Sequence, residues 1–148
     1  MEEHKKKKHQ VLRDGPITPA FIADSIAKHS AKTNIGAHAI FLGQIRRDTK
    51  DGRTVQNIEY TAHQEMAENA FETIRENAFQ KYPIICMHIY HSLGIVAAGE
   101  ISLFVFISCK HREQSFTALE EIVEEIKKNV PVWKKENYED SSYSWIGS

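Results

Sequence analysis

The stretch Ile101-Ser-Leu-Phe-Val-Phe-Ile-Ser-Cys109 decides the fold of this chain. It is apolar and uncharged along its length, which predicts a buried strand. The next residues, Lys110-His-Arg112, lead into a helix from about Arg112 to Asn129 that carries an apolar stripe and stops before Pro131. A buried strand followed directly by an amphipathic helix predicts a sheet with a helix packed across one face.

Further helix and strand patterns lie on both sides of this unit. Thr18-Pro19 is a good N-cap and first-turn pair for a short helix, and Gln64 to Lys81 repeats apolar residues at helical spacing. Strand patterns occupy residues 36–45, 54–62, 84–91 and, as a terminal hairpin, 132–146. The first two are expected to pair around the Asp51-Gly52 turn signal, and Gly94 and Gly99 are expected in a connection. These patterns predict an α+β domain with a mostly antiparallel sheet, about three helices and a C-terminal hairpin.

The composition is that of an ordinary globular protein. The 148 residues are 41% hydrophobic and 26% charged, and the net charge of -1 does not indicate a general attraction to nucleic acid or anionic membranes. Residues 1–14 are expected to form a flexible basic arm around the run Lys5 to Lys8, and residues 15–148 a single domain. No apolar segment follows that run, and the two cysteines make no disulfide framework, so a cytoplasmic location is expected.

Cationic side chains gather around the long C-terminal helix. His111 and Arg112 stand at its start, where free N–H groups already favour anions, and Lys127 stands near its end. At 100° per residue, Lys127 lies about 70° from the centre of the apolar stripe, whereas Lys128 lies about 170° away and points into water. Lys134 follows Trp133, an aromatic expected to be largely buried. With Arg46 at a strand end, these residues predict a site for phosphate or another oxyanion.

The spacing along this helix limits how the cations can meet. Arg112 and Lys127 are about 22 Å apart on a straight helix, so their side chains cannot reach one small ligand within a single chain. Either two separate sites exist, or a neighbouring subunit completes one site. We hypothesise a homodimer in which His111 and Arg112 of one chain face Lys127 and Lys134 of the other.

Other readings of these residues remain open. The same cations could serve a non-catalytic anion- or nucleotide-binding module, and the Lys5 to Lys8 run could bind RNA, although no aromatic stacking platform lies near it. His88 and His91 have metal-ligand spacing but point to opposite faces of a strand, so no metal site is predicted. Cys109 ends a buried strand and is expected to pack as a small hydrophobe.

Several segments together resemble the large, catalytic subunit of molybdopterin synthase. They are, in order, Phe41-Leu-Gly-Gln-Ile-Arg46, Ile58-Glu-Tyr60, Met66-Ala-Glu68, His91-x-x-Gly94 with Gly99-Glu100, Lys110-His-Arg112, and Lys127-x-x-Val-Pro-Val-Trp-Lys-Lys-Glu136. The resemblance covers roughly residues 15 to 146. It implies an α/β-hammerhead type of α+β fold and a central homodimer, with a small ubiquitin-like sulfur-carrier subunit at each end of a heterotetramer.

The resemblance also implies a reaction and a set of site residues. Sulfur would pass from the carrier's C-terminal Gly-Gly thiocarboxylate to cyclic pyranopterin monophosphate, twice, to form the dithiolene of molybdopterin. The residues at matching positions are Lys127 and Lys134 as catalytic groups, and Arg46, His111, Arg112, Phe41 and Val123 as substrate-binding groups. The resemblance implies no metal and no cofactor, because the sulfur arrives on the partner.

Overall fold

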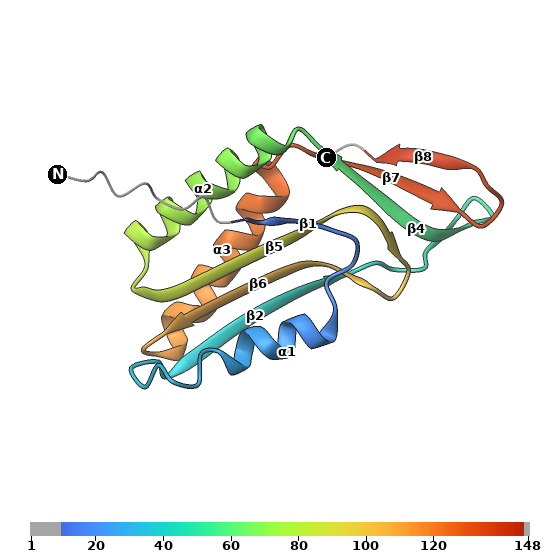
Figure 1. Ribbon diagram of the computed structural model, residues 1–148. Coiled ribbons are helices and arrows are strands. Elements are labelled where there is room, and N and C mark those ends of the chain that lie inside the picture. Colours follow the sequence, from blue (N-terminus) through green and yellow to red (C-terminus); the bar gives the residue numbers. More distant parts are fainter. Residues whose placement is uncertain (1–9, 147–148) are drawn as a thin grey trace.

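The computed structural model describes residues 10–146, which form three helices and one eight-stranded sheet (Figure 1). The elements are β1 (Leu12–Asp14), α1 (Pro19–Ala27), β2 (Ala37–Gln44), β3 (Thr49–Lys50), β4 (Arg53–Ala62), α2 (Gln64–Lys81), β5 (Ile84–Ala97), β6 (Ile101–Cys109), α3 (Arg112–Asn129), β7 (Val132–Tyr138) and β8 (Tyr143–Ile146). The sheet order is β2-β6-β5-β4-β7-β8, with β1 beside β5 and β3 beside β4. All pairings are antiparallel except that of β1 with β5. The predicted α+β class, mostly antiparallel sheet and terminal hairpin are confirmed.

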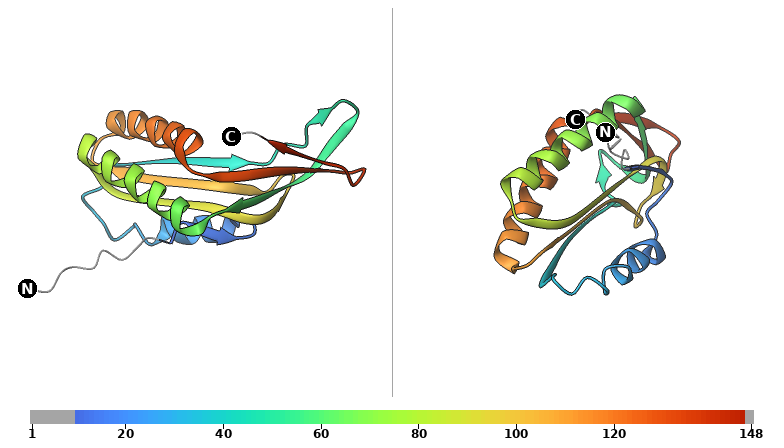
Figure 2. Two further views of the ribbon diagram at one scale, coloured as in Figure 1. Left: turned by 90° about the horizontal axis from the view of Figure 1, so that it is seen from above. Right: turned by 60° about the vertical axis from the view of Figure 1, so that its left-hand side comes forward.

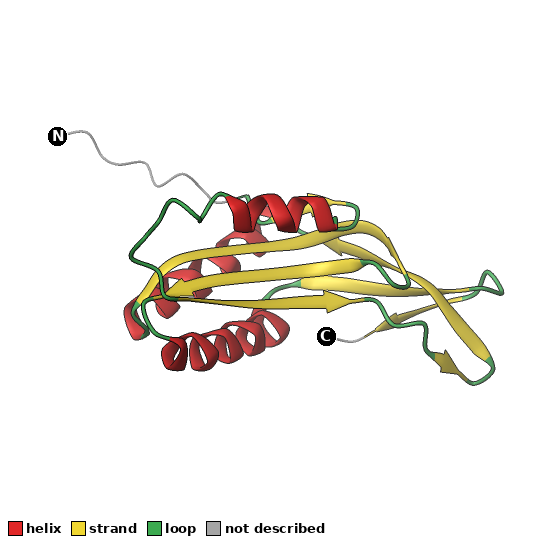
Figure 3. Ribbon diagram, turned by 90° about the horizontal axis from the view of Figure 1, so that it is seen from below, coloured by secondary structure: helices red, strands yellow, loops and turns green. Residues whose placement is uncertain are grey.

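Two apolar layers cover the sheet from opposite sides. Helices α2 and α3 pack on one face with the main core, which includes Phe71, Val105 and Ile122. On the other face, α1 covers a smaller cluster that contains Phe104 and Phe106 (Figure 2, right). Because β6 alternates its side chains between both layers, it is buried along almost its whole length, as the uncharged run predicts. The hairpins β3–β4 and β7–β8 extend from the helix-covered part of the sheet (Figure 3).

The two long helices have the boundaries that their sequences predict. Helix α2 begins after His63, whose Nδ1 accepts a hydrogen bond from the Met66 N–H, and it ends before Pro83. Helix α3 begins after His111 and ends at Asn129, because Pro131 has no N–H to continue it. Helical spacing predicts Phe116 in the apolar stripe, but it is 65% exposed, and the smaller Ser115 and Ala118 lie on the buried face instead. None of the helices in the described part of the chain is long and apolar enough to cross a membrane.

Three expectations about the strands were wrong. Strands β2 and β4 do not pair: β2 pairs with the buried β6, while the Asp51-Gly52 turn joins β4 to the short β3. Both turn residues have positive φ, which suits a tight hairpin. The strand predicted at residues 84–91 continues through Gly94, which was expected in a connection, to Ala97 as β5. Gly94, at φ 79, lies in the part of β5 that pairs with β4, beyond its pairing with β6.

Part of the expected basic arm is ordered. Leu12–Asp14 pairs with His91–Leu93 as β1, and Val11 is buried. Glu68 of α2 accepts hydrogen bonds from the backbone N–H groups of Val11 and Leu12, which fixes this segment to the domain. Placing the end of a flexible arm at residue 14 was therefore wrong. The Lys5 to Lys8 run lies outside the described residues.

Candidate active site

Two cavities are lined by both Lys127 and Lys134. The larger has a volume of about 300 Å³, and its wall also includes Arg46, Lys50 and Glu136. The smaller, of about 190 Å³, is lined by His91 and by apolar side chains from β6, α3 and β7. The structure therefore brings together three of the cationic residues singled out in the sequence, namely Arg46, Lys127 and Lys134.

The two lysines reach this place from different elements. Lys127 lies in the last turn of α3, and the chain then turns at Pro131 into β7, where Lys134 pairs with Tyr60 of β4. Along β7, Val132, Lys134 and Glu136 share the face that lines the cavities, whereas Lys135 points to the other face and contacts Glu59. Trp133 also lies on that other face and is 52% exposed, so the expectation that it is largely buried was wrong.

The surroundings of Lys127 lower the pKa of its amino group. The residue as a whole is exposed, yet burial of its amino group lowers the pKa below the ordinary value of 10.5, and the charge of Lys134 lowers it further. A lysine with a lowered pKa is better able to exchange a proton near neutral pH.

A buried carboxylate completes the larger cavity. The side chain of Glu136 is 8% exposed and accepts hydrogen bonds from Lys50 Nζ at 3.2 Å and from the Tyr138 hydroxyl at 3.1 Å. Lys50 belongs to the β3–β4 hairpin, so this ion pair attaches the hairpin to β7. Sequence reasoning did not assign a role to Glu136, although its alternation with Lys134 along β7 places both on one face.

Arg46 stands at the opening of the larger cavity. It follows β2, its side chain is 82% exposed, and its Nη2 lies 3.2 Å from a carboxylate oxygen of Asp48. Such an exposed ion pair is worth little in water, so the guanidinium remains available to an incoming anion. Deeper in the wall, the Tyr60 hydroxyl donates to Ser102 Oγ at 3.0 Å, and burial raises the pKa of Tyr60.

The other predicted site residues lie elsewhere in the single chain. His111 and Arg112 are exposed at the opposite end of α3 from Lys127. Phe41 and Val123 pack against the main core and do not line either of the two cavities in the described part of the chain. One chain therefore does not assemble the full predicted set.

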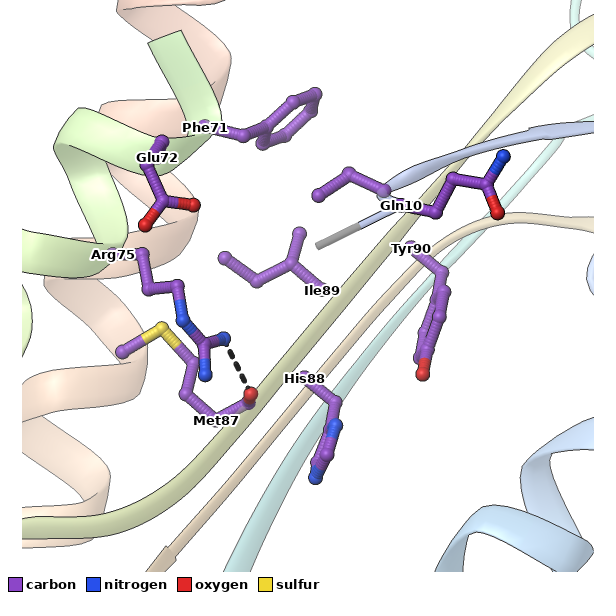
Figure 4. Close-up of a pocket in the computed structure, with 9 residues that line it drawn as sticks. Gln10, Phe71, Glu72, Arg75, Met87, His88, Ile89 and Tyr90 are labelled. Carbon is purple, nitrogen blue, oxygen red and sulfur yellow. Dashed lines mark hydrogen bonds between the residues drawn. The ribbon is translucent and has the colours of Figure 1, made fainter. Parts of the chain in front are cut away.

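A third, smaller cavity is separate from these cations. It has a volume of about 60 Å³ and lies between α2 and β5 (Figure 4). Arg75 lines this cavity, and its guanidinium donates to the backbone oxygen of Met87 at 2.6 Å and lies over the Phe79 ring. Burial lowers the pKa of Arg75, and its contacts tie α2 to the sheet.

The fold and site define a class: an α+β domain whose sheet and last helix hold a cluster of cations around a cavity, suited to an anionic substrate. The model of the MoaE protein family matches residues 14–129, and the chain belongs to this family. It is 40% identical over 125 residues to the molybdopterin synthase catalytic subunit of Pyrococcus abyssi, covering 84% of this chain and 82% of that relative. The human molybdopterin synthase catalytic subunit is 37% identical over 113 residues, and the match spans 76% of this chain and 59% of the human protein.

Solved structures show the same fold. Molybdopterin synthase from Staphylococcus aureus superimposes with a TM-score of 0.83 at 30% identity, covering 96% of this chain and 98% of that one. A chain from the complex of subunits 1 and 2 of the molybdopterin-converting factor from Helicobacter pylori superimposes with a TM-score of 0.78 at 20% identity, covering 93% of this chain and 90% of that one.

Proposed function

We propose that the cavities around Lys127 and Lys134 are the active site with which this chain works as the catalytic subunit of a molybdopterin synthase. In this reaction, sulfur passes from the C-terminal thiocarboxylate of a small carrier subunit to cyclic pyranopterin monophosphate and forms a dithiolene. The observation that supports this site most strongly is that α3 and β7 direct Lys127 and Lys134 into shared cavities, with Arg46 at the opening of the larger one.

The chemistry of these side chains suits both reactants. The substrate carries a phosphate, which Arg46 can bind through charge-assisted hydrogen bonds. Once the sulfur is bonded to the substrate, attack of water on the carrier's acyl carbon breaks the carbon–sulfur bond. The sulfur stays on the substrate, and the carrier's end becomes a carboxylate. Negative charge develops on the carbonyl oxygen and the sulfur during this step. The ammonium groups of Lys127 and Lys134 can stabilise that charge.

A second copy of the chain would complete the site. His111 and Arg112 lie at the far end of α3 from Lys127, about 22 Å along a straight helix. In the proposed homodimer, they approach the lysine cavity of the other chain and add a helix N-terminus for the phosphate. Phe41 and Val123 would serve as apolar lining near this junction. A carrier subunit on each chain would then give a heterotetramer.

The same cations could instead bind an anion without turnover. Purified chain, thiocarboxylated carrier and cyclic pyranopterin monophosphate distinguish the two functions. We expect dithiolene product from the wild-type chain and about 100-fold slower turnover after Lys127→Ala, with a much smaller loss of phosphate binding. Lys128→Ala, on the adjacent solvent-facing position, is the matched control and should retain wild-type turnover. Phosphate binding without any product would support the binding module.

We also propose that the reaction takes place in the cytoplasm. Cys86 and Cys109 are both buried and free, as suits a reducing compartment.

A further inference from the structure

His91 lies in the wall of the smaller lysine cavity. It is 7% exposed on β5, and it lines the smaller cavity with Lys127 and Lys134. Its Nδ1 lies 2.8 Å from the backbone oxygen of Ser92. Because a carbonyl oxygen only accepts hydrogen bonds, Nδ1 carries the proton, and Nε2 of the neutral ring keeps its lone pair.

Neighbouring rings hold the imidazole in place. The Tyr60 ring meets it edge to face with centroids 5.1 Å apart, and the Phe71 ring lies 6.2 Å away on the α2 side. Burial, together with the charges of Lys127 and Lys134, lowers the pKa of His91 to about 4. The ring is therefore neutral at pH 7, and its tautomer and orientation are both fixed.

The smaller cavity contains donors for this nitrogen but no other side-chain acceptor. Among the described residues that line it, Lys127 and Lys134 supply ammonium groups, and the rest apart from His91 are apolar. Two ammonium groups that share a cavity repel one another, so a neutral acceptor beside them favours their charged forms.

We propose that His91 is a positioning residue whose Nε2 accepts a hydrogen bond from the Lys127 ammonium and directs it toward the reacting carbonyl. This inference rests on the proposed function, because it assigns Lys127 its orientation in sulfur transfer. His91 itself does not contact the substrate in this account. Its neutral ring provides an acceptor without adding a third positive charge.

Two substitutions distinguish the role of Nδ1 from that of Nε2. His91→Asn keeps a donor for the Ser92 oxygen but removes the acceptor at the position of Nε2. His91→Gln extends its side-chain oxygen to about the place of Nε2. We expect His91→Asn to reduce kcat at least 10-fold with an unchanged KM for the carrier, and His91→Gln to recover most of that loss. Equal loss in both variants would overturn the proposal.

The pKa of Lys127 gives a readout that does not depend on turnover. In protein labelled at the lysine side chains, NMR titration should show a lower Lys127 pKa in His91→Asn than in wild type, and recovery in His91→Gln. Among the residues that the structure describes, Tyr60, Lys127 and Lys134 are titratable groups that face His91 from β4, α3 and β7, and Tyr60→Phe controls for the first of them. A Lys127 pKa that does not change in either variant would overturn the positioning role.

These outcomes also separate this inference from the proposed function. If the wild-type chain forms no product but the Lys127 pKa follows His91, the proposed function fails and the hydrogen bond stands. If product forms and His91→Asn is fully active, the positioning role fails alone.

Should both variants unfold, the NMR chemical shifts of the two His91 ring nitrogens in the wild-type chain provide the test. Protonated Nδ1 and bare Nε2 support the proposal, and the opposite tautomer overturns it.

Discussion

Lys127, in the last turn of α3, and Lys134, in β7, line the same two cavities although Pro131 separates their elements. The charge of Lys134 is one cause of the lowered Lys127 pKa, after burial. The two side chains therefore act as an electrostatically coupled pair.

This coupling predicts how one lysine responds to loss of the other. Lys134→Met should raise the pKa of Lys127 toward its ordinary value, because the repelling charge is removed and burial remains. NMR titration of labelled lysines measures this shift. Lys135→Met is the matched control, because Lys135 lies on the opposite face of β7 beside Glu59. A Lys127 pKa that is insensitive to Lys134 would show that the pair is not coupled.

The buried histidine predicts a loss of stability in mild acid. The pKa of His91 is about 4 in the folded chain and 6.5 in the unfolded chain, so the unfolded chain binds more protons between these values. The stability that depends on a neutral His91 is complete above pH 6.5 and is lost as the pH falls toward 4. The free energy of unfolding lost over this pH range is about 3 kcal/mol. Denaturant unfolding measured across this range should show a shallower pH dependence in His91→Gln than in wild type. Equal slopes would contradict a buried neutral histidine.

The ion pair between Lys50 and Glu136 should contribute to stability. Lys50→Met leaves the Glu136 carboxylate, which is 8% exposed, with a hydrogen bond from the Tyr138 hydroxyl but without its ammonium partner. The expected cost is about 1 kcal/mol, since Lys50 itself is half exposed. A double-mutant cycle with Glu136→Gln should show coupling above about 0.5 kcal/mol. The exposed pair Arg47–Glu139 is the control, and Arg47→Met should cost less. Additive effects of Lys50→Met and Glu136→Gln would show that the pair contributes no specific energy.

The proposed homodimer predicts complementation between inactive variants. A chain with His111→Ala and Arg112→Ala keeps its lysine cavity, and a chain with Lys127→Ala keeps its helix N-terminus. A mixed dimer should therefore contain one complete site out of two. Its turnover should reach up to about half that of a wild-type dimer. Turnover of the mixture, after exchange of subunits, measures this recovery. No recovery, with mixed dimers shown to form, would count against a site shared between chains.

Local sequence signals were enough to predict the helices and to single out Lys127 and Lys134. Helices α2 and α3 have the predicted ends because Pro83 and Pro131 stop them, and the position of Lys127 at the border of the apolar face follows from helical spacing. The partners of β2 and β4 were not predictable in the same way. Strand pairing depends on contacts between distant residues, and the Asp51-Gly52 turn signal favoured a local hairpin that the buried β6 overrides.

The rest of the site depends on long-range packing. Lys50 and Glu136 meet only because β4 and β7 are neighbours, and His91 reaches the lysines across the sheet. Phe41 and Val123 were predicted from the family resemblance, and within one chain they pack against the core instead of lining the two lysine cavities. Alternation along β7 could have added Glu136 to the site, because it shares a face with Lys134.

The location of the carrier's tail tests the central claim most directly. A photoreactive group at the C-terminal residue of the carrier, followed by mass spectrometry of the cross-linked peptides, measures where that tail lies. We expect cross-links to the segments around Arg46, Lys127 and Lys134, with His111 and Arg112 of the partner subunit as further contacts. Cross-links confined to α1 or to the Arg75 cavity would contradict the assignment of the lysine cavities as the active site.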